Sequence, residues 1–114
     1  MELTDLQRDY LADVSKAIDS MRQHGRGLAE RGTFKSAFPA LLFLTHQLKG
    51  SGGSLGFPGI TNVAQAMSRE LSQFLDDERA DRPTPEELSR TLTALTSELE
   101  REVASAQAHL SPRA

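Results

Sequence analysis

The chain has 114 residues, of which 38% are hydrophobic, and a formal net charge of -3 at pH 7. This length allows one domain with a single modest core. The chain has no cysteine, which excludes a disulfide framework and thiol chemistry. Its lysines and arginines are dispersed and form no basic stripe, so nucleic-acid binding is not expected. The sequence opens without a signal segment, and the apolar patch at residues 37–44 is far too short to span a membrane, so we expect a soluble cytoplasmic protein.

The first predicted helix covers residues 3–24, and we expect Gly25 and Gly27 to end it. Thr4 and Gln7 have the spacing of a capping box. The apolar residues of this segment recur at spacings of three and four, which predicts one buried face made of Leu3, Leu6, Tyr10, Val14, Ile18 and Met21.

The second predicted helix begins between Thr33 and Pro39, because proline suits a first turn but kinks an established helix. It runs through His46 into a glycine-rich stretch. The third helix follows Phe57 and Pro58 and stops in the acidic run 76–78. Its apolar stripe consists of Ile60, Val63, Ala64, Met67, Leu71 and Phe74.

The fourth predicted helix has Thr84 as its N-cap, Pro85 at its first position and Glu87 three residues after the cap. Its apolar stripe consists of Leu88, Leu92, Leu95, Leu99, Val103, Ala106 and Leu110. No segment alternates with the period of two that a strand requires. Four amphipathic helices with short links predict an all-α fold, an antiparallel up-down-up-down four-helix bundle.

The most informative segment is residues 46–56, which read His-Gln-Leu-Lys-Gly-Ser-Gly-Gly-Ser-Leu-Gly. Each helical residue advances by about 100°, so one stripe with His46 at its centre contains Leu42, Lys49, Gly50 and Gly53. Four leucines lie on the opposite side, and their burial is expected to turn His46 to solvent: Leu41, Leu44, Leu48 and Leu55. A largely neutral imidazole in this position is a potential nucleophile.

Lys49 and Gly50 give this stripe a cation and bare backbone beside the imidazole. The lysine offers charge to an incoming anion, and the glycine leaves room for a bulky group or a partner's loop. A glycine inside a helix is less favourable than alanine by about 1 kcal/mol. Four of the eight glycines nevertheless lie at positions 50, 52, 53 and 56, which indicates a purpose other than helix stability.

The pattern His46-x-Leu48-Lys49-Gly50-Ser51-x-Gly53-x-Leu55-Gly56 resembles the histidine-containing phosphotransfer (Hpt) domains of two-component phosphorelays and the phospho-accepting domains of chemotaxis-type kinases. The resemblance implies that His46 accepts a phosphoryl group from an aspartate of a receiver domain and passes it to another receiver, with Lys49 steadying the phosphate. It implies a single domain over residues 1–110 with a short tail at 111–114.

The same resemblance implies response-regulator receiver domains and a sensor histidine kinase as partners of a monomeric phosphoprotein. It implies no cofactor in this chain, because magnesium is expected on the receiver, and neither ATP binding nor kinase activity of its own. The sequence itself contains no phosphate-binding loop motif. Three widely spaced histidines without cysteine make a metal site improbable.

One position departs from the family pattern. Many members carry Glu or Gln twenty-two residues after the histidine, where the side chain bonds the imidazole, whereas this chain has Ser68. Gln65 or Glu70 could substitute for it. Glutamate is frequent there in kinase-attached domains, so its absence favours a separate phosphotransfer module.

Two interpretations are open for the apolar residues Leu42, Phe43 and Phe57. They form either core at a helix edge or an exposed rim on which a receiver's helix docks. His24 and His109 lie near predicted helix ends, where a structural role is expected. Two alternatives to the relay intermediate remain: a non-phosphorylated adaptor or inhibitor that binds a kinase or receiver, and the phospho-accepting module of a chemotaxis-type kinase.

Overall fold

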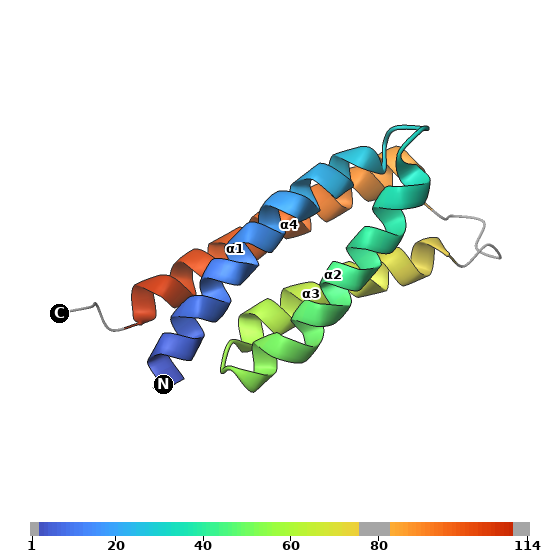
Figure 1. Ribbon diagram of the computed structural model, residues 1–114. Coiled ribbons are helices and arrows are strands. Elements are labelled where there is room, and N and C mark those ends of the chain that lie inside the picture. The colour runs from blue at the N-terminus through green and yellow to red at the C-terminus, as the bar shows by residue number, and fades with distance from the viewer. Residues whose placement is uncertain (1–2, 76–82, 111–114) are drawn as a thin grey trace.

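The protein is an all-α bundle of four antiparallel helices, as predicted. A computed structural model describes residues 3–75 and 83–110, so the predicted tail at 111–114 and the acidic run at 76–78 lie outside the described residues. The helices are α1 (Leu3–Gly27), α2 (Phe34–Ser54), α3 (Pro58–Phe74) and α4 (Pro85–His109). Each helix packs on two neighbours, so that α1 lies beside α4 and α2 beside α3 (Figure 1). None of these helices is long and apolar enough to cross a membrane.

The start of α4 confirms the predicted capping box. The Thr84 hydroxyl accepts a bond from the Glu87 backbone N–H at 3.1 Å, and the Glu87 carboxylate accepts one from the Thr84 N–H at 3.3 Å. Pro85 occupies the first helical position, where a missing N–H costs nothing. These contacts fix the residue at which α4 begins.

The boundaries of α1 differ from the prediction. Gly25 lies inside the helix, which continues to Gly27, and Thr4 lies inside its first turn and is not an N-cap. The Gln7 amide donates instead to the Leu55 carbonyl at the end of α2. A long-range bond therefore replaces the expected local one.

The start of α2 precedes the proline. The helix begins at Phe34, because the N–H groups of Ser36 and Ala37 already bond the Thr33 carbonyl. Pro39 lies past the first turn, so the helix lacks the bond that an N–H at this position would donate.

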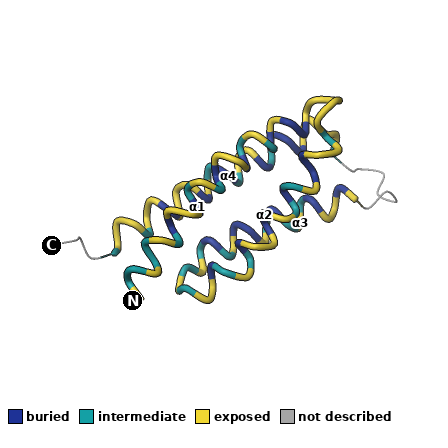
Figure 2. The backbone as a smooth tube through the Cα atoms, in the orientation of Figure 1, coloured by how far each residue is buried: buried dark blue, intermediate teal, exposed yellow. Residues whose placement is uncertain are grey.

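The core runs along the inner faces of all four helices (Figure 2). In α3 the predicted stripe is fully buried. In α4, Leu88, Leu92, Leu99 and Val103 are buried, while the other predicted members are half-buried and pack against the core.

The prediction for the first turns of α1 was wrong. Leu3 and Leu6 are 62% and 44% exposed, whereas Leu11, which the predicted stripe omitted, is fully buried. The cause is the length of α2. Gln7 already reaches Leu55, just beyond the last residue of α2, so the turn before Gln7 has no residue of α2 to pack against.

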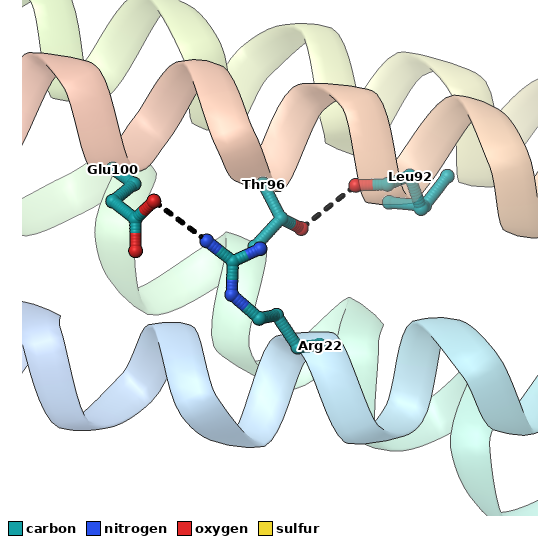
Figure 3. Close-up of polar contacts among 4 residues, drawn as sticks. All are labelled: Arg22, Leu92, Thr96 and Glu100. Carbon is teal, nitrogen blue, oxygen red and sulfur yellow. Dashed lines mark hydrogen bonds and ion pairs between the residues drawn. The ribbon is translucent and has the colours of Figure 1, made fainter.

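Among residues 3–75 and 83–110, three polar residues are buried as whole residues, and each of these three is hydrogen-bonded. Thr45 and Thr96 donate to carbonyls of their own helices, at 3.1 and 2.7 Å, and Ser89 donates to the Gly25 carbonyl of α1 at 2.6 Å. At the surface, Arg22 of α1 forms an ion pair with Glu100 of α4 at 2.8 Å (Figure 3). Such a partly exposed pair contributes little to stability.

α2 and α3 come close together at Gly52 of α2. A Cβ atom at this position would lie 2.6 Å from Thr61 Oγ1 and 3.2 Å from the Phe57 carbonyl oxygen. Only glycine allows α2 and α3 to come this close. A Cβ atom at Gly50, two residues earlier, would meet nothing within 4 Å.

These two glycines make a matched pair for a stability measurement. We expect Gly52→Ala to lower the free energy of unfolding by about 1–3 kcal/mol, since the added methyl group overlaps α3. Gly50→Ala should raise it by up to about 1 kcal/mol through helix propensity alone. Urea unfolding followed by circular dichroism measures both changes, and a stabilised Gly52→Ala would contradict the close approach.

Candidate functional site

His46 lies on the outer face of α2 and is exposed. The opposite face of the helix points into the core through Leu41, Thr45, Leu48 and Gly52. Leu44 and Leu55, which were expected to be buried, are only half-buried, and Thr45 takes a core position that the apolar pattern did not predict. Burial of this inner face leaves the imidazole in solvent.

Bare backbone and apolar side chains surround the imidazole. Gly50 and Gly53, on either side of the His46 stripe, are exposed, and a Cβ atom at Gly53 would touch only Thr61 Oγ1, at 3.7 Å. Phe43 is 62% exposed, while Leu42 is half-buried against the core. A partner can therefore approach His46 closely from the glycine side and meet an aromatic ring one turn earlier.

The contact between Gly52 and Thr61 shows which part of α3 lies beside His46. Because α2 and α3 are antiparallel, the residue seven positions after Thr61 lies level with the residue seven positions before Gly52. Ser68 therefore lies at the height of Thr45. Seven helical residues return to within about 20° of the same face, so Ser68 lies on the side of α3 that faces α2. Gln65, four residues after Thr61, is about 40° away on the same side.

Glu70 lies on a different side of α3. A Cβ atom at Gly59 would collide with the Glu102 carboxylate, so this side faces α4. Glu70 follows Gly59 by eleven residues, within about 20° of the same direction. Glu70 therefore does not replace the missing Glu or Gln as the residue that bonds the imidazole, which corrects the expectation that it could.

Within residues 3–75 and 83–110, no hydrogen bond or ion pair involves the His46 side chain. Ser68 is half-buried and Gln65 is exposed. Both lie alongside α2, but neither bonds the ring.

The charged side chains of α2 are all positive, whereas Asp13 of α1 lies across the groove beside Gln47. α2 contains Lys35 and Lys49 and no acidic residue, and Lys35, eleven residues before His46, lies on the same stripe. α3 adds the exposed Arg69, while its one acidic residue faces α4. In a chain with a net charge of -3, this face favours the approach of an anion.

On its other flank, the end of α2 contacts α1. The Tyr10 hydroxyl lies 2.9 Å from Ser51 Oγ, and the Gln7 amide donates to the Leu55 carbonyl at 2.8 Å. The Tyr10 ring stacks on Phe57, with centroids 5.9 Å apart and planes 6° from parallel. Phe57, a predicted docking residue, is therefore half-buried at the turn between α2 and α3.

A shallow groove of about 370 Å³ lies beside this contact, between α1 and α2. Its lining includes Tyr10, Asp13 and Ala17 of α1 with Gln47, Leu48 and Ser51 of α2. The sequence interpretation did not pair Gln7, Tyr10 and Ser51. The one available signal was a tyrosine within an apolar stripe, because a buried phenol normally finds a hydrogen-bond partner.

Comparison with known proteins identifies the family. The model of the Hpt domain family matches residues 5–109, so the chain belongs to the Hpt family. Hpt domains carry out histidine phosphotransfer in phosphorelays, and they generally interact with receiver domains. Searches of the curated proteins and of the solved structures find no match to this chain. The described residues contain no group of three or more His, Asp or Glu side chains that could hold a metal ion.

The contact of Tyr10 with α2 predicts a measurable shift of its titration. Burial raises the pKa of the Tyr10 phenol above its ordinary value, and a hydrogen bond from Ser51 to the ionised phenolate partly offsets this effect. The chain has one tyrosine and no tryptophan, so tyrosinate absorbance reports on this group alone. We expect the folded protein to titrate at higher pH than the protein in denaturant.

The pH dependence of the free energy of unfolding tests the same shift of the Tyr10 pKa. Because the folded pKa is the higher one, the contribution to stability is complete below the unfolded value of about 10 and is lost as pH rises through the folded value. Tyr10→Phe should lack this part of the pH dependence. Identical titration midpoints with and without denaturant would contradict the burial of the phenol.

Proposed function

We propose that His46 is the phospho-accepting residue of this Hpt domain and that it relays a phosphoryl group between receiver domains in a cytoplasmic phosphorelay. The observation that carries this proposal is the exposed imidazole on a face with bare glycine backbone and no acidic residue. The other two histidines differ. His109 Nδ1 is paired with the Ser105 carbonyl at 2.7 Å, and His24 is half-buried near the end of α1.

In the proposed reaction, an unprotonated ring nitrogen of His46 attacks the phosphorus of an aspartyl phosphate on a docked receiver. The N–P bond forms as the P–O bond to the aspartate breaks, and the carboxylate leaves with the bonding electron pair. A second receiver reverses these steps. The receiver supplies the magnesium ion, and Lys49 adds positive charge beside the transferring group.

The neighbouring residues have distinct proposed roles. Leu42 and Phe43 contribute the apolar rim on which the receiver docks, and Gly50 and Gly53 allow its active-site loops to come close. Gln65 and Ser68 lie on the side of α3 that faces α2, where Gln65 has the longer reach toward the ring. Phe57 supports the turn through Tyr10, so its contribution to docking is indirect.

One observation favours a second candidate, a non-phosphorylated adaptor that binds a receiver or kinase. No described residue bonds the His46 ring, whereas the family pattern supplies an amide or a carboxylate at the position of Ser68. The half-buried Lys49 and the exposed glycines beside the imidazole favour the relay.

The proposal predicts that His46→Gln abolishes phosphoryl acceptance and leaves the fold intact, because the side chain is exposed. The measurement incubates the protein with an aspartate-phosphorylated receiver and magnesium and detects acid-labile, base-stable label. His24→Gln and His109→Gln are matched controls that should keep the label. A labelled His46→Gln protein would refute the assignment, and an unlabelled folded wild type with several receivers would support the adaptor.

A second prediction separates a local effect of the Lys49 charge from the general electrostatic attraction of the receiver. Lys49→Ala should slow transfer by about ten-fold, the loss of one charge-assisted hydrogen bond of about 1.5 kcal/mol. Lys35→Ala also removes one positive charge from the stripe, at a position about 16 Å from His46 along the helix axis. It should reduce only the salt-dependent rate of encounter. Equal effects of both variants on the rate at saturating receiver would leave Lys49 without a specific role.

A further inference from the structure

The last turns of α2 are intrinsically weak. Gly50, Gly52 and Gly53 all lie within the helix, where glycine is intrinsically less favourable than alanine. This segment begins directly after Lys49 and includes the bare backbone beside His46. Contacts that keep it helical therefore determine the geometry of the proposed phosphotransfer site.

Two side chains of α1 hold this segment. The Gln7 amide bonds the Leu55 carbonyl just after the helix, and the Tyr10 hydroxyl pairs with Ser51 in the middle of the glycines. The Ser51 hydroxyl donates its own proton to the Gln47 carbonyl at 2.9 Å. Tyr10 must therefore be the donor to Ser51, and the two bonds form a chain from α1 to the residue next to His46.

The tyrosine is itself well fixed. Its ring stacks on Phe57 at the start of α3, which leaves the hydroxyl directed at α2. Burial raises the pKa of Tyr10, so the phenol keeps its proton and remains a donor. On the opposite flank, Gly52 packs against Thr61. The segment is held from α1 and from α3, and only the face with Gly50 and Gly53 is open.

We propose that Tyr10 is a positioning residue for phosphoryl transfer, which acts through Ser51 to keep the end of α2 helical and Lys49 in place beside His46. The inference rests on the proposed function of His46. Without the phenol hydroxyl, the segment from Gly50 to Ser54 opens more often, and Lys49 loses its fixed position. The apolar rim at Leu42 and Phe43 precedes His46 and stays helical, so this part of the docking surface is preserved.

The test is Tyr10→Phe, which keeps the ring and its stacking on Phe57 and removes only the hydroxyl. We expect the rate of transfer from a phosphorylated receiver at saturation to fall by about five- to ten-fold, with KM changed by less than about two-fold. Amide hydrogen exchange at residues 50–55 should become faster. Adding Ser51→Ala should cause no further loss, because both changes break the same chain.

Two controls separate positioning from general stability. In a Lys49→Ala background, Tyr10→Phe should have little further effect on the rate, since it acts through Lys49. Ser89→Ala removes another hydrogen bond between helices, from the buried Ser89 to the Gly25 carbonyl. It should lower the free energy of unfolding and leave the transfer rate unchanged.

The outcomes distinguish this inference from the proposed function. If wild type transfers phosphoryl groups and Tyr10→Phe does so at the same saturating rate, the positioning role is overturned and the function of His46 stands. A Ser89→Ala protein that is slowed as much as Tyr10→Phe would also overturn it. If wild type accepts no phosphoryl group, the proposed function fails, whereas the hydrogen-exchange measurement still decides whether Tyr10 holds the end of α2.

Discussion

The close packing of α2 against α3 at Gly52 is the constraint on which the site depends. It sets the register of the two antiparallel helices and thereby decides which residues of α3 lie beside His46. The approach has a cost, because Thr61 Oγ1 is buried there without a hydrogen-bond partner among the described residues. The glycines of α2 are therefore not equivalent. Gly52 serves packing, and Gly50 and Gly53 leave the outer face bare.

Charge is divided between the two halves of the bundle. α2 carries lysines and no acidic residue, whereas α4 carries five glutamates and two arginines. The outer face of α2 is therefore positive although the overall charge is -3. An anionic partner is attracted to one side of the bundle, and this local field, not the net charge, is relevant to phosphoryl transfer.

The sequence predicted the four helices, the capping box of α4 and the buried stripe of α3, because each depends on local periodicity or capping chemistry. It mispredicted Leu3 and Leu11, because periodicity does not reveal where the neighbouring helix ends. For a related reason, the sequence left both Gln65 and Glu70 as candidates for the residue that bonds the imidazole. An amphipathic stripe identifies the buried face, but the handedness of the bundle decides whether a flanking residue faces α2 or α4. The buried polar residues Thr45, Ser89 and Thr96 were missed because an apolar pattern treats them as surface.

The substitution at Ser68 changes how precision is achieved at the proposed site. An amide or carboxylate at this position bonds the imidazole in the family pattern, whereas Ser68 has a shorter side chain and makes no hydrogen bond with the His46 ring. The orientation of the His46 ring then depends more on the backbone that carries it and on the charge beside it. That backbone continues into the glycine-rich end of α2, which is held by Gln7 and Tyr10. In the proposed mechanism, α1 thus takes part of the task that the family pattern gives to α3.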